Sequence, residues 1–554
     1  MSYAEAQYTI DEVLAGMKKN MVAGNEPNNL KNIIVLGGDG HNIISFEAQD
    51  TVLDGQVITT TAGVIVRRKI GAYPDDENDG DFVLDVSGAE LDKYNTEPYI
   101  DEGLVNGTEY FYRFFPYSSY GMMNRSMKNT ASSIPHVNTI WGFHQNFLDT
   151  NPDTCITYLG SATGYNPMHT IYGGSPSYTK GSWANWEWLQ KNKPYCLDAD
   201  GKPVIAVDPS AYNKSIGGEA IDYSNEGFGY DYFAWFPKLY MKEIYAADGN
   251  SRDVYFALKR EGDTWDYIPV GFYNKNGEEL EGLWLPMFIP YITASQCRSI
   301  YYKTILDGVY NSVSSIMGFI ENRWGEERGV ALGGPILNVI RDLLYLLYRS
   351  TDIQKHAGNG FSMKNSLVTT GSTVNGSVGS ATGQGFFGYY VTQNNTGSHA
   401  CRIFHSVVFL TSLRQLFDPY SYSHGGRGFM TKNYSKPLAE TEPGKDGFTQ
   451  TNILYTPSST SRFPAKLKYC GDGYGSVPDF NDNSGSSSTG LTDRTTIQYV
   501  GQAKAIFQRF GDYSTGLNGG IAYQYLSSQT YTYGQNNITV APMLLPDVGF
   551  DPTV

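Results

Sequence analysis

The chain has 554 residues, with 41 Lys plus Arg against 56 Asp plus Glu and a formal net charge of −15. A chain of that length is too long to fold around one hydrophobic core, and it suggests about three domains. The negative charge repels phosphate backbones and anionic bilayers, so we expect no nucleic-acid partner and no membrane insertion. The 43 tyrosines are typical of β-dominated surfaces, where a flat amphipathic ring covers a pleated sheet.

Signals for export and for covalent cross-linking are missing. Residues 1–5 contain neither a basic nor an apolar region, so we expect no secretory signal and assembly in a cytoplasm. The longest apolar stretch, 336–348, is too short to span a bilayer and is broken by Arg341 and Asp342. The five cysteines are odd in number and lack CxxC spacing, which favours buried thiols over a disulfide scaffold or zinc ribbon.

The first predicted element is a short amphipathic helix over residues 9–21. Thr9 and Glu12 form a capping box, and apolar residues recur at helical spacing up to Met21. Because so short a helix is marginal in water, its apolar stripe must dock, either on the next domain or on another subunit. We assign residues 1–30 to this helix, as an attachment or oligomerisation element.

From about residue 32 the apolar period changes to two, which predicts a β-sandwich over 31–135. Turn residues separate short strands, which we expect at 33–36, 43–46, 57–61, 64–68, 82–86 and 110–114. The stretch 104–114 resembles the fibronectin type III signature at the corner before strand F. That resemblance implies structural roles for Leu104 and for Tyr110, whose hydroxyl would bind the corner backbone.

The rest of the chain is predicted as a β-rich connecting region over 136–230 and an α+β domain over 231–554. Strands are expected at 236–242 and 253–258, and Gly334-Pro335 opens a helix with an apolar stripe that ends near Arg349. The segments 364–398 and 471–495 are rich in Gly, Ser, Thr and Asn, so we expect long loops or sheet-edge excursions.

The order of these pieces resembles a family of phage and prophage tail-fibre or receptor-binding proteins with a C-type-lectin-like C-terminal domain. The matching residues include Pro194-x-Cys196-Leu197, the run 235–242, the run 296–300 and the helix around 343–354. The stretch 511–523 looks like the glycine-rich segment that closes this fold. The resemblance implies a multidomain, β-rich chain: a short N-terminal helix, a fibronectin III-like β-sandwich, then an α+β C-type-lectin-like domain.

No motif for nucleotide or zinc-protease chemistry occurs, and we expect no enzyme, no cofactor and no metal. His399, Cys401 and His405 have spacings that suit a metal only on a helix, whereas their neighbours favour strand. The acidic run 75–81 fails the EF-hand register, so a solvated turn is the better interpretation. Trp183, Trp186 and Trp188 fit either a glycan platform or a buried core.

The sequence therefore predicts a non-enzymatic virion protein, a tail fibre or receptor-binding component assembled in the host cytoplasm. Its partners would be other virion proteins, further copies in a homotrimer, and a host-surface glycan or protein bound multivalently. We place binding in the two loops, with Tyr389, Tyr390, Tyr474 and Phe480 as their aromatic contacts. The alternatives are a capsid or collar decoration protein without a receptor, and a bacterial carbohydrate-binding or carbohydrate-active protein.

Overall fold

The fold is β-rich, with several antiparallel sheets and few helices. The chain divides into two compact units: Met1–Thr139 with Lys259–Asp266, and Ile140–Leu258 with Tyr267–Val554. The computed structural model describes residues 26–53, 56–95, 97–137, 139–171, 177–209, 213–221, 229–288, 291–292, 295–300, 313–357, 403–406, 415–424, 427–434, 448–454, 460–486, 488–491, 495–498, 505–509, 524–527, 538–539 and 541–553. In these ranges no helix is long and apolar enough to cross a membrane. The helix predicted at 9–21 lies outside them.

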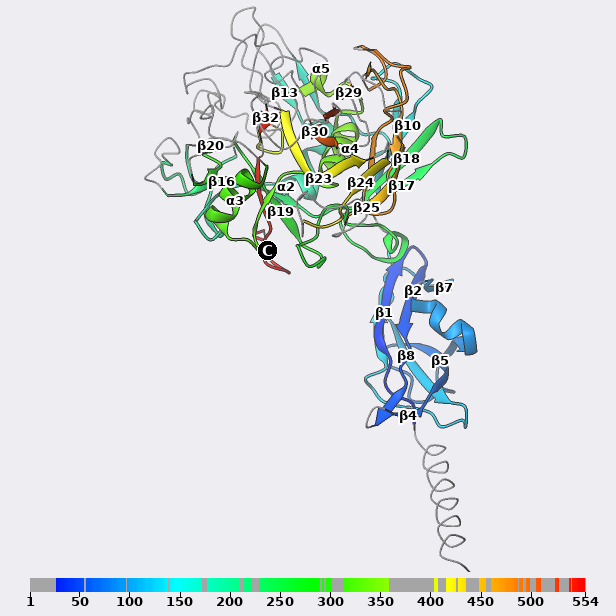
Figure 1. The fold of residues 1–554 in the computed structure, drawn as a ribbon. Helices are drawn as coiled ribbons and strands as arrows, with labels where there is room; N and C mark the ends of the chain where they lie inside the picture. The colour runs from blue at the N-terminus through cyan, green and yellow to red at the C-terminus, as the bar shows by residue number, and fades with distance from the viewer. Residues whose placement is uncertain are drawn as a thin grey trace, which may run out of the picture. The chain divides into compact units, whose positions relative to one another are not determined.

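The first unit contains a β-sandwich (Figure 1). Over its described residues, one sheet has three strands and the other has four. The three-stranded sheet has the order β1 (Lys31–Gly38), β2 (His41–Glu47), β7 (Tyr99–Glu102). The four-stranded sheet has the order β6 (Asp81–Ser87), β5 (Thr61–Ile70), β8 (Tyr110–Ser118), β9 (Thr130–Ser133). A hairpin of β3 (Thr51–Leu53) and β4 (Gln56–Thr59) and the 3-10 helix η1 (Gly88–Asn95) complete it. Both sheets contribute to one apolar core, which includes Ile44, Phe46, Val64, Val66 and Phe114.

A buried polar contact joins the two sheets inside this core. The Tyr112 hydroxyl on β8 donates to Asp101 Oδ2 on β7 at 2.7 Å, and it accepts from Asn42 Nδ2 on β2 at 2.8 Å. Arg68 on β5 pairs with the same carboxylate. Burial and the neighbouring Asp101 raise the pKa of Tyr112 far above its ordinary value, so this hydroxyl stays protonated and keeps donating.

The corner before β8 has the geometry that the resemblance implied. The backbone N–H of Val105 donates to the Tyr110 hydroxyl at 3.1 Å, and both Leu104 and Tyr110 are buried. The segment Lys259–Asp266, with the 3-10 helix η4 (Gly262–Thr264), packs against β1 and β2 of the same unit. There His136 Nε2 lies 2.8 Å from Glu261 Oε2, and His41 Nε2 lies 3.2 Å from Asp263 Oδ1.

We predict that Tyr110→Phe lowers the free energy of unfolding of the sandwich by about 1 kcal/mol, because the Val105 N–H is left without its partner. Thermal and denaturant unfolding measure this change. Tyr120→Phe is the matched control, since Tyr120 is 59% exposed. Equal stability of the two variants would contradict the corner bond.

The second unit is built on two antiparallel sheets of described strands (Figure 1). One runs β15 (Pro203–Ala206), β14 (Pro194–Leu197), β16 (Asp231–Pro237), β19 (Gly282–Pro286), β33 (Pro542–Leu544), β22 (Gly329–Ala331). The other runs β11 (Ile156–Gly160), β10 (Trp141–Asn146), β18 (Ser251–Ala257), β17 (Tyr240–Tyr245). The described helices are α2 (Glu187–Lys191), α3 (Val313–Trp324), α4 (Ile336–Tyr348) and α5 (Ile353–Ala357), and η2 (Gly181–Asn185) is a 3-10 turn.

The remaining described strands form a third sheet and three hairpins. The sheet runs β25 (Thr449–Leu454), β24 (Arg427–Met430), β23 (Gln415–His424), β30 (Ala505–Arg509), β31 (Gln524–Ser527), β29 (Thr495–Gln498), β26 (Thr460–Arg462), and β32 (Ile538–Thr539) pairs with β23. The hairpins are β12 (His169–Ile171) with β13 (Ser177–Thr179), β20 (Tyr291–Ile292) with β21 (Cys297–Arg298), and β27 (Leu467–Tyr469) with β28 (Ser476–Pro478).

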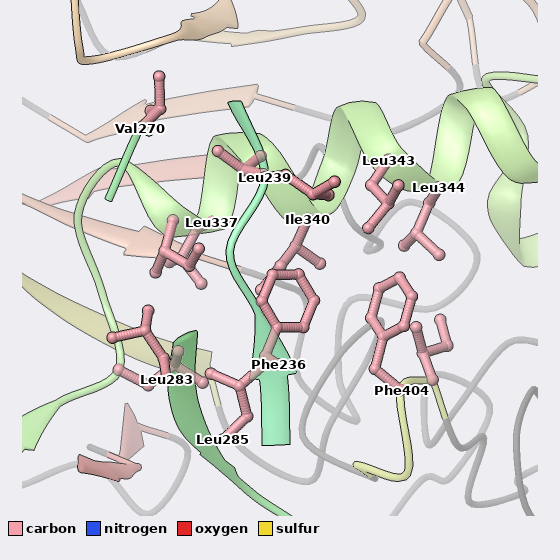
Figure 2. Close-up of a cluster of buried hydrophobic side chains, with 14 of the residues drawn as sticks. Phe236, Leu239, Val270, Leu283, Leu285, Leu337, Ile340, Leu343, Leu344 and Phe404 are labelled. Atoms are coloured by element: carbon pink, nitrogen blue, oxygen red, sulfur yellow. The ribbon is translucent and has the colours of Figure 1, made fainter. Parts of the chain in front are cut away.

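Helix α4 is the centre of the second unit's core. The predicted helix is confirmed: it begins at Ile336, ends at Tyr348, and every one of its residues is buried. Figure 2 shows Leu337, Ile340, Leu343 and Leu344 pointing at side chains from β16 and β19, with Phe404 beside them. Arg349 ends the helix in the left-handed conformation, with φ 50°.

Two sequence predictions differ from this arrangement. Residues 136–230 are not a separate connecting region, because β10 pairs with β18 and β14 pairs with β16, so the second unit begins at Ile140. The strand predicted at 236–242 is two strands in different sheets. The chain leaves β16 at Pro237, the N–H of Lys238 donates to Glu281 O at 2.9 Å, and β17 begins at Tyr240.

Candidate functional site

The aromatic residues assigned to binding are not all surface residues. Tyr389 and Tyr390 lie outside the described residues. Tyr474 and Phe480 are only 6% and 1% exposed, in a small core with Met430, Ile453, Cys470 and Val477. We therefore correct their role: they are the apolar groups of a polar segment, so the hydrophobic effect draws them inward as its anchor. Burial also raises the pKa of Tyr474.

The tryptophan cluster is likewise core. Trp183, Trp186 and Trp188 are at most 4% exposed, and their rings pack in sequence with centroids 5.3 and 5.4 Å apart. Of the two interpretations left open by the sequence, the structure selects the buried one for these three rings.

The predicted loop 471–495 is not loop throughout, because Ser476–Pro478 form β28 and pair with β27. The described residues that follow β28 are held in one shape by side-chain caps. Asp482 Oδ2 accepts the N–H groups of Ala465 and Lys466, at 2.6 and 2.9 Å. Asn483 Oδ1 accepts the N–H of Phe463 at 3.0 Å, and Gly485 N donates to Phe463 O at 2.8 Å. Asx and Ser/Thr turns of this kind fix a loop backbone without regular secondary structure.

The surface of this loop is polar. Its exposed side chains, among the described residues, are Asp472, Asn481, Asn483, Ser484 and Ser488. Hydroxyl and amide groups on a backbone that is already ordered lose little conformational entropy when they bind a partner. The loop therefore offers hydrogen-bonding groups, where the sequence had suggested aromatic contacts.

Hydrogen bonds join three separate parts of the second unit near Gly490. Thr351 Oγ1, six residues before the end of α5, donates to Gly490 O at 2.5 Å. Gly490 N donates to Thr150 O at 2.7 Å, and Thr351 N donates to Pro152 O at 3.1 Å. The residues between α4 and α5, the Gly490 end of the predicted 471–495 loop and the β10–β11 turn are thus joined.

Asp153, in the β10–β11 turn, clamps α5 at this junction. Its carboxylate accepts from Ser350 Oγ at 2.9 Å, lies 2.7 Å from His356 Nε2, and pairs with Lys355. Burial alone would raise its pKa, but the hydrogen bonds from Lys355, His356 and Ser350 outweigh burial and lower the pKa of Asp153 to about 2. The group is ionised at neutral pH, and it fixes the last described turn before residue 358.

Residues 403–406, the next described residues after α5, form a buried turn. Ile403 and Ser406 exchange backbone hydrogen bonds of 2.8 and 2.9 Å across Phe404 and His405, which both have positive φ. The Phe404 ring packs edge-on against Trp188 and Phe236, with centroids 5.3 Å away in each case. His405 Nε2 lies 3.1 Å from Asn192 O.

A buried charge network lies beneath the 474–476 end of the loop. Arg252 on β18 is fully buried and makes two hydrogen bonds to Asp342 on α4, at 2.6 and 3.0 Å. It also donates to Glu243 Oε2 at 2.8 Å and to Gln145 Oε1 at 2.9 Å. Arg341 binds the same Asp342 carboxylate.

The same network reaches the loop itself. Arg341 donates to Ser476 O at 2.8 Å, Asn338 Nδ2 donates to Tyr474 O at 2.8 Å, and Ser476 Oγ donates to Glu243. Burial would raise the pKa of Asp342, but Arg252 and Arg341 outweigh it and hold that pKa below its ordinary value. Burial raises the pKa of Glu243. The polar residues of α4 thus position the base of the candidate loop.

Within the described ranges, no group of three or more His, Cys, Asp or Glu side chains is arranged to hold a metal ion. His399 and Cys401 lie outside those ranges. The run 75–81 is a turn in which Asp76 Oδ1 accepts the N–H of Asn78 and Asp79 pairs with Lys69. Burial raises the pKa of the Cys155 and Cys196 thiols to about 12, so neither is a thiolate at neutral pH.

Comparison with known proteins found neither a family model that matches the chain nor a curated relative with significant similarity.

Asp342→Asn should lower the free energy of unfolding of the second unit by about 3–5 kcal/mol, because it removes the carboxylate charge that the buried guanidinium groups of Arg252 and Arg341 share. Denaturant unfolding followed by tryptophan fluorescence measures the change. Asp248→Asn is the control: Asp248 caps an exposed turn by accepting the N–H of Asn250, which an asparagine oxygen also accepts. If Asp342→Asn lowered the free energy of unfolding by less than the control does, the charge network would not stabilise the second unit.

The contacts of Asp153 predict that the stability of the second unit depends on pH. Because the pKa of Asp153 is lowered in the folded protein, its contribution to the free energy of unfolding is complete above about pH 4 and is lost as the pH falls towards 2. At pH 7 we expect Asp153→Asn to cost about 1 kcal/mol, allowing for solvent screening of a partly exposed carboxylate. The difference from the wild type should shrink between pH 4 and 2.

Unfolding of both proteins at a series of pH values measures that difference. Asp200→Asn, at an exposed side chain of the same unit, is the control and should show no such trend. A stability gap that stays constant down to pH 2 would contradict the clamp.

Proposed function

We propose that this chain is a phage virion protein, a tail-fibre or receptor-binding component that attaches to the host by multivalent, non-catalytic binding. In this proposal the binding surface is made by the segments 364–398 and 471–495. Other virion proteins and further copies of the chain, in a homotrimer, are its assembly partners. When weak sites are repeated on one particle, together they give strong attachment.

The observation that carries the proposal is the junction of Thr351, Gly490 and Thr150. The Thr351–Gly490 and Gly490–Thr150 hydrogen bonds bring together residues that are 139 and 340 positions apart. Recognition tends to reside in loops that a rigid scaffold holds. Here the scaffold is the buried helix α4 with its charge network, and the described loop carries exposed Asn and Ser side chains.

Two resemblances support the proposed architecture. The sheet orders β1–β2–β7 and β6–β5–β8–β9, with the Tyr110–Val105 bond at the corner, fit a fibronectin III-like spacer. In the second unit, β33 near the end of the chain lies between β19 and β22, which fits a C-type-lectin-like domain closed by its C-terminal strand. The segment 511–523, which carried part of that resemblance, lies outside the described residues.

The proposal predicts a loss of host attachment when the loop surface is altered and the core is left intact. The variant combines Ser484→Arg and Ser488→Arg with replacement of 364–398 by a short Gly-Ser linker. It keeps Tyr474 and Phe480, which the small core needs. We expect adsorption to cells of the host bacterium to fall at least ~10-fold, because each repeated contact is weakened.

Ser119→Arg is the matched control, since Ser119 is an exposed residue of the sandwich. Thermal unfolding of both variants verifies that the second unit remains folded. Adsorption equal to that of the control would overturn the placement of binding in these loops. Failure of the wild-type chain to adsorb at all would favour a decoration protein of the capsid or collar.

A further inference from the structure

The sheet β11–β10–β18–β17 has an outward face that belongs to neither predicted loop. Its inward side chains, including Phe143, Val254 and Phe256, lie in the core of the second unit. Because strand residues alternate, the residues between them face outward. The register gives two neighbouring rows, which are Lys242, Tyr255, Gly142, Leu159 and Ile244, Asp253, His144, Thr157.

Tyr255 lies across the glycine opposite it. A Cβ on Gly142 would be 2.7 Å from Tyr255 Cδ1 and 3.2 Å from its Cε1, so any larger residue would push the ring away. Only glycine lets the ring lie on the backbone of β10. The ring also packs against the buried cluster of Tyr240, Ala257 and Tyr267, and it remains only partly buried.

Hydrogen-bonding groups border this ring in the next row. His144 Nδ1 lies 2.7 Å from Asp253 Oδ1, and the Tyr255 hydroxyl donates to Asp253 Oδ2 at 3.4 Å. The side chains of His144 and Asp253 are 37% and 34% exposed. With Nδ1 engaged by the carboxylate, Nε2 of His144 is the ring nitrogen left to meet a ligand.

Charges on this face are balanced. Asp253 is next to His144, and Lys242 lies with its ammonium over the Tyr267 ring, 5.7 Å from the centroid. A phosphorylated ligand would meet the Asp253 carboxylate, and an apolar peptide would bury that carboxylate without compensation. A pyranose ring fits both the tyrosine ring and the polar groups beside it. Its C–H face can cover an aromatic ring, and its hydroxyls can bind a carboxylate and an imidazole nitrogen.

We propose that this face binds a neutral pyranose sugar, with Tyr255 as the stacking platform and Asp253 and His144 as hydrogen-bond partners for the sugar hydroxyls. The inference rests on the proposed function, because it names a host-surface glycan as the chemistry that the virion protein meets. It adds a binding surface on a described sheet, apart from the two loops.

The test uses the full-length chain and an array of neutral glucose-, galactose- and mannose-based oligosaccharides. We expect wild type to bind at least one of them, Tyr255→Ala and Asp253→Ala to weaken that binding at least ~5-fold, and Tyr255→Phe to retain it, because phenylalanine preserves the stacking ring. Tyr255→Leu, which keeps apolar bulk over Gly142, replaces Tyr255→Ala if that variant unfolds. Ile244→Ala, at an exposed position on the same face, is the control.

No binding of the folded wild type to any array member would overturn the sugar site, as would unchanged binding by both Tyr255→Ala and Tyr255→Leu. The same variants in the host-cell adsorption assay separate the two proposals. Adsorption without sugar binding leaves the proposed function standing and removes this site. Sugar binding by a chain that does not adsorb to the host keeps the site and removes the proposed function.

Discussion

A guanidinium group with no access to water constrains the second unit. Arg252 can be buried only because Asp342, Glu243 and Gln145 together satisfy its charge and its N–H groups. Since these partners come from α4, β17 and β10, the helix cannot slide or rotate against the sheet without exposing an unpaired charge. Apolar packing around α4 is non-directional by comparison, so the ionic contacts fix its register.

That register sets the geometry of the surface above it. Asn338 and Arg341 are one helical turn apart, and both donate to carbonyl groups in the 474–476 segment. The other end of α4 leads into Ser350 and Thr351, where the β10–β11 turn and Gly490 meet. Helix α4 therefore holds the start of the candidate loop, and Thr351, three residues after the helix, binds its end at Gly490. The proposed binding groups are thus attached to the rigid core.

The sequence predicts those elements whose signal is local. Helix α4 follows from its apolar stripe, and the sandwich follows from a period of two with turn residues between strands. The break at Pro237 was missed, because it depends on a bond from Lys238 to a residue 43 positions away. Composition identified 471–495 as a polar loop but could not show that Phe480 is its core. The Asp153–His356 pair spans 203 positions, so no motif marks it.

The Phe404 turn has a consequence for how this protein can change. Asp153 holds α5 through Ser350, Lys355 and His356. After residue 402, the Phe404 ring packs against Trp188 and Phe236 in the core of the second unit. None of these contacting residues belongs to the segment 364–398. Substitutions in that segment therefore leave the named contacts of both anchors intact, and selection can act on the segment and on the anchors separately.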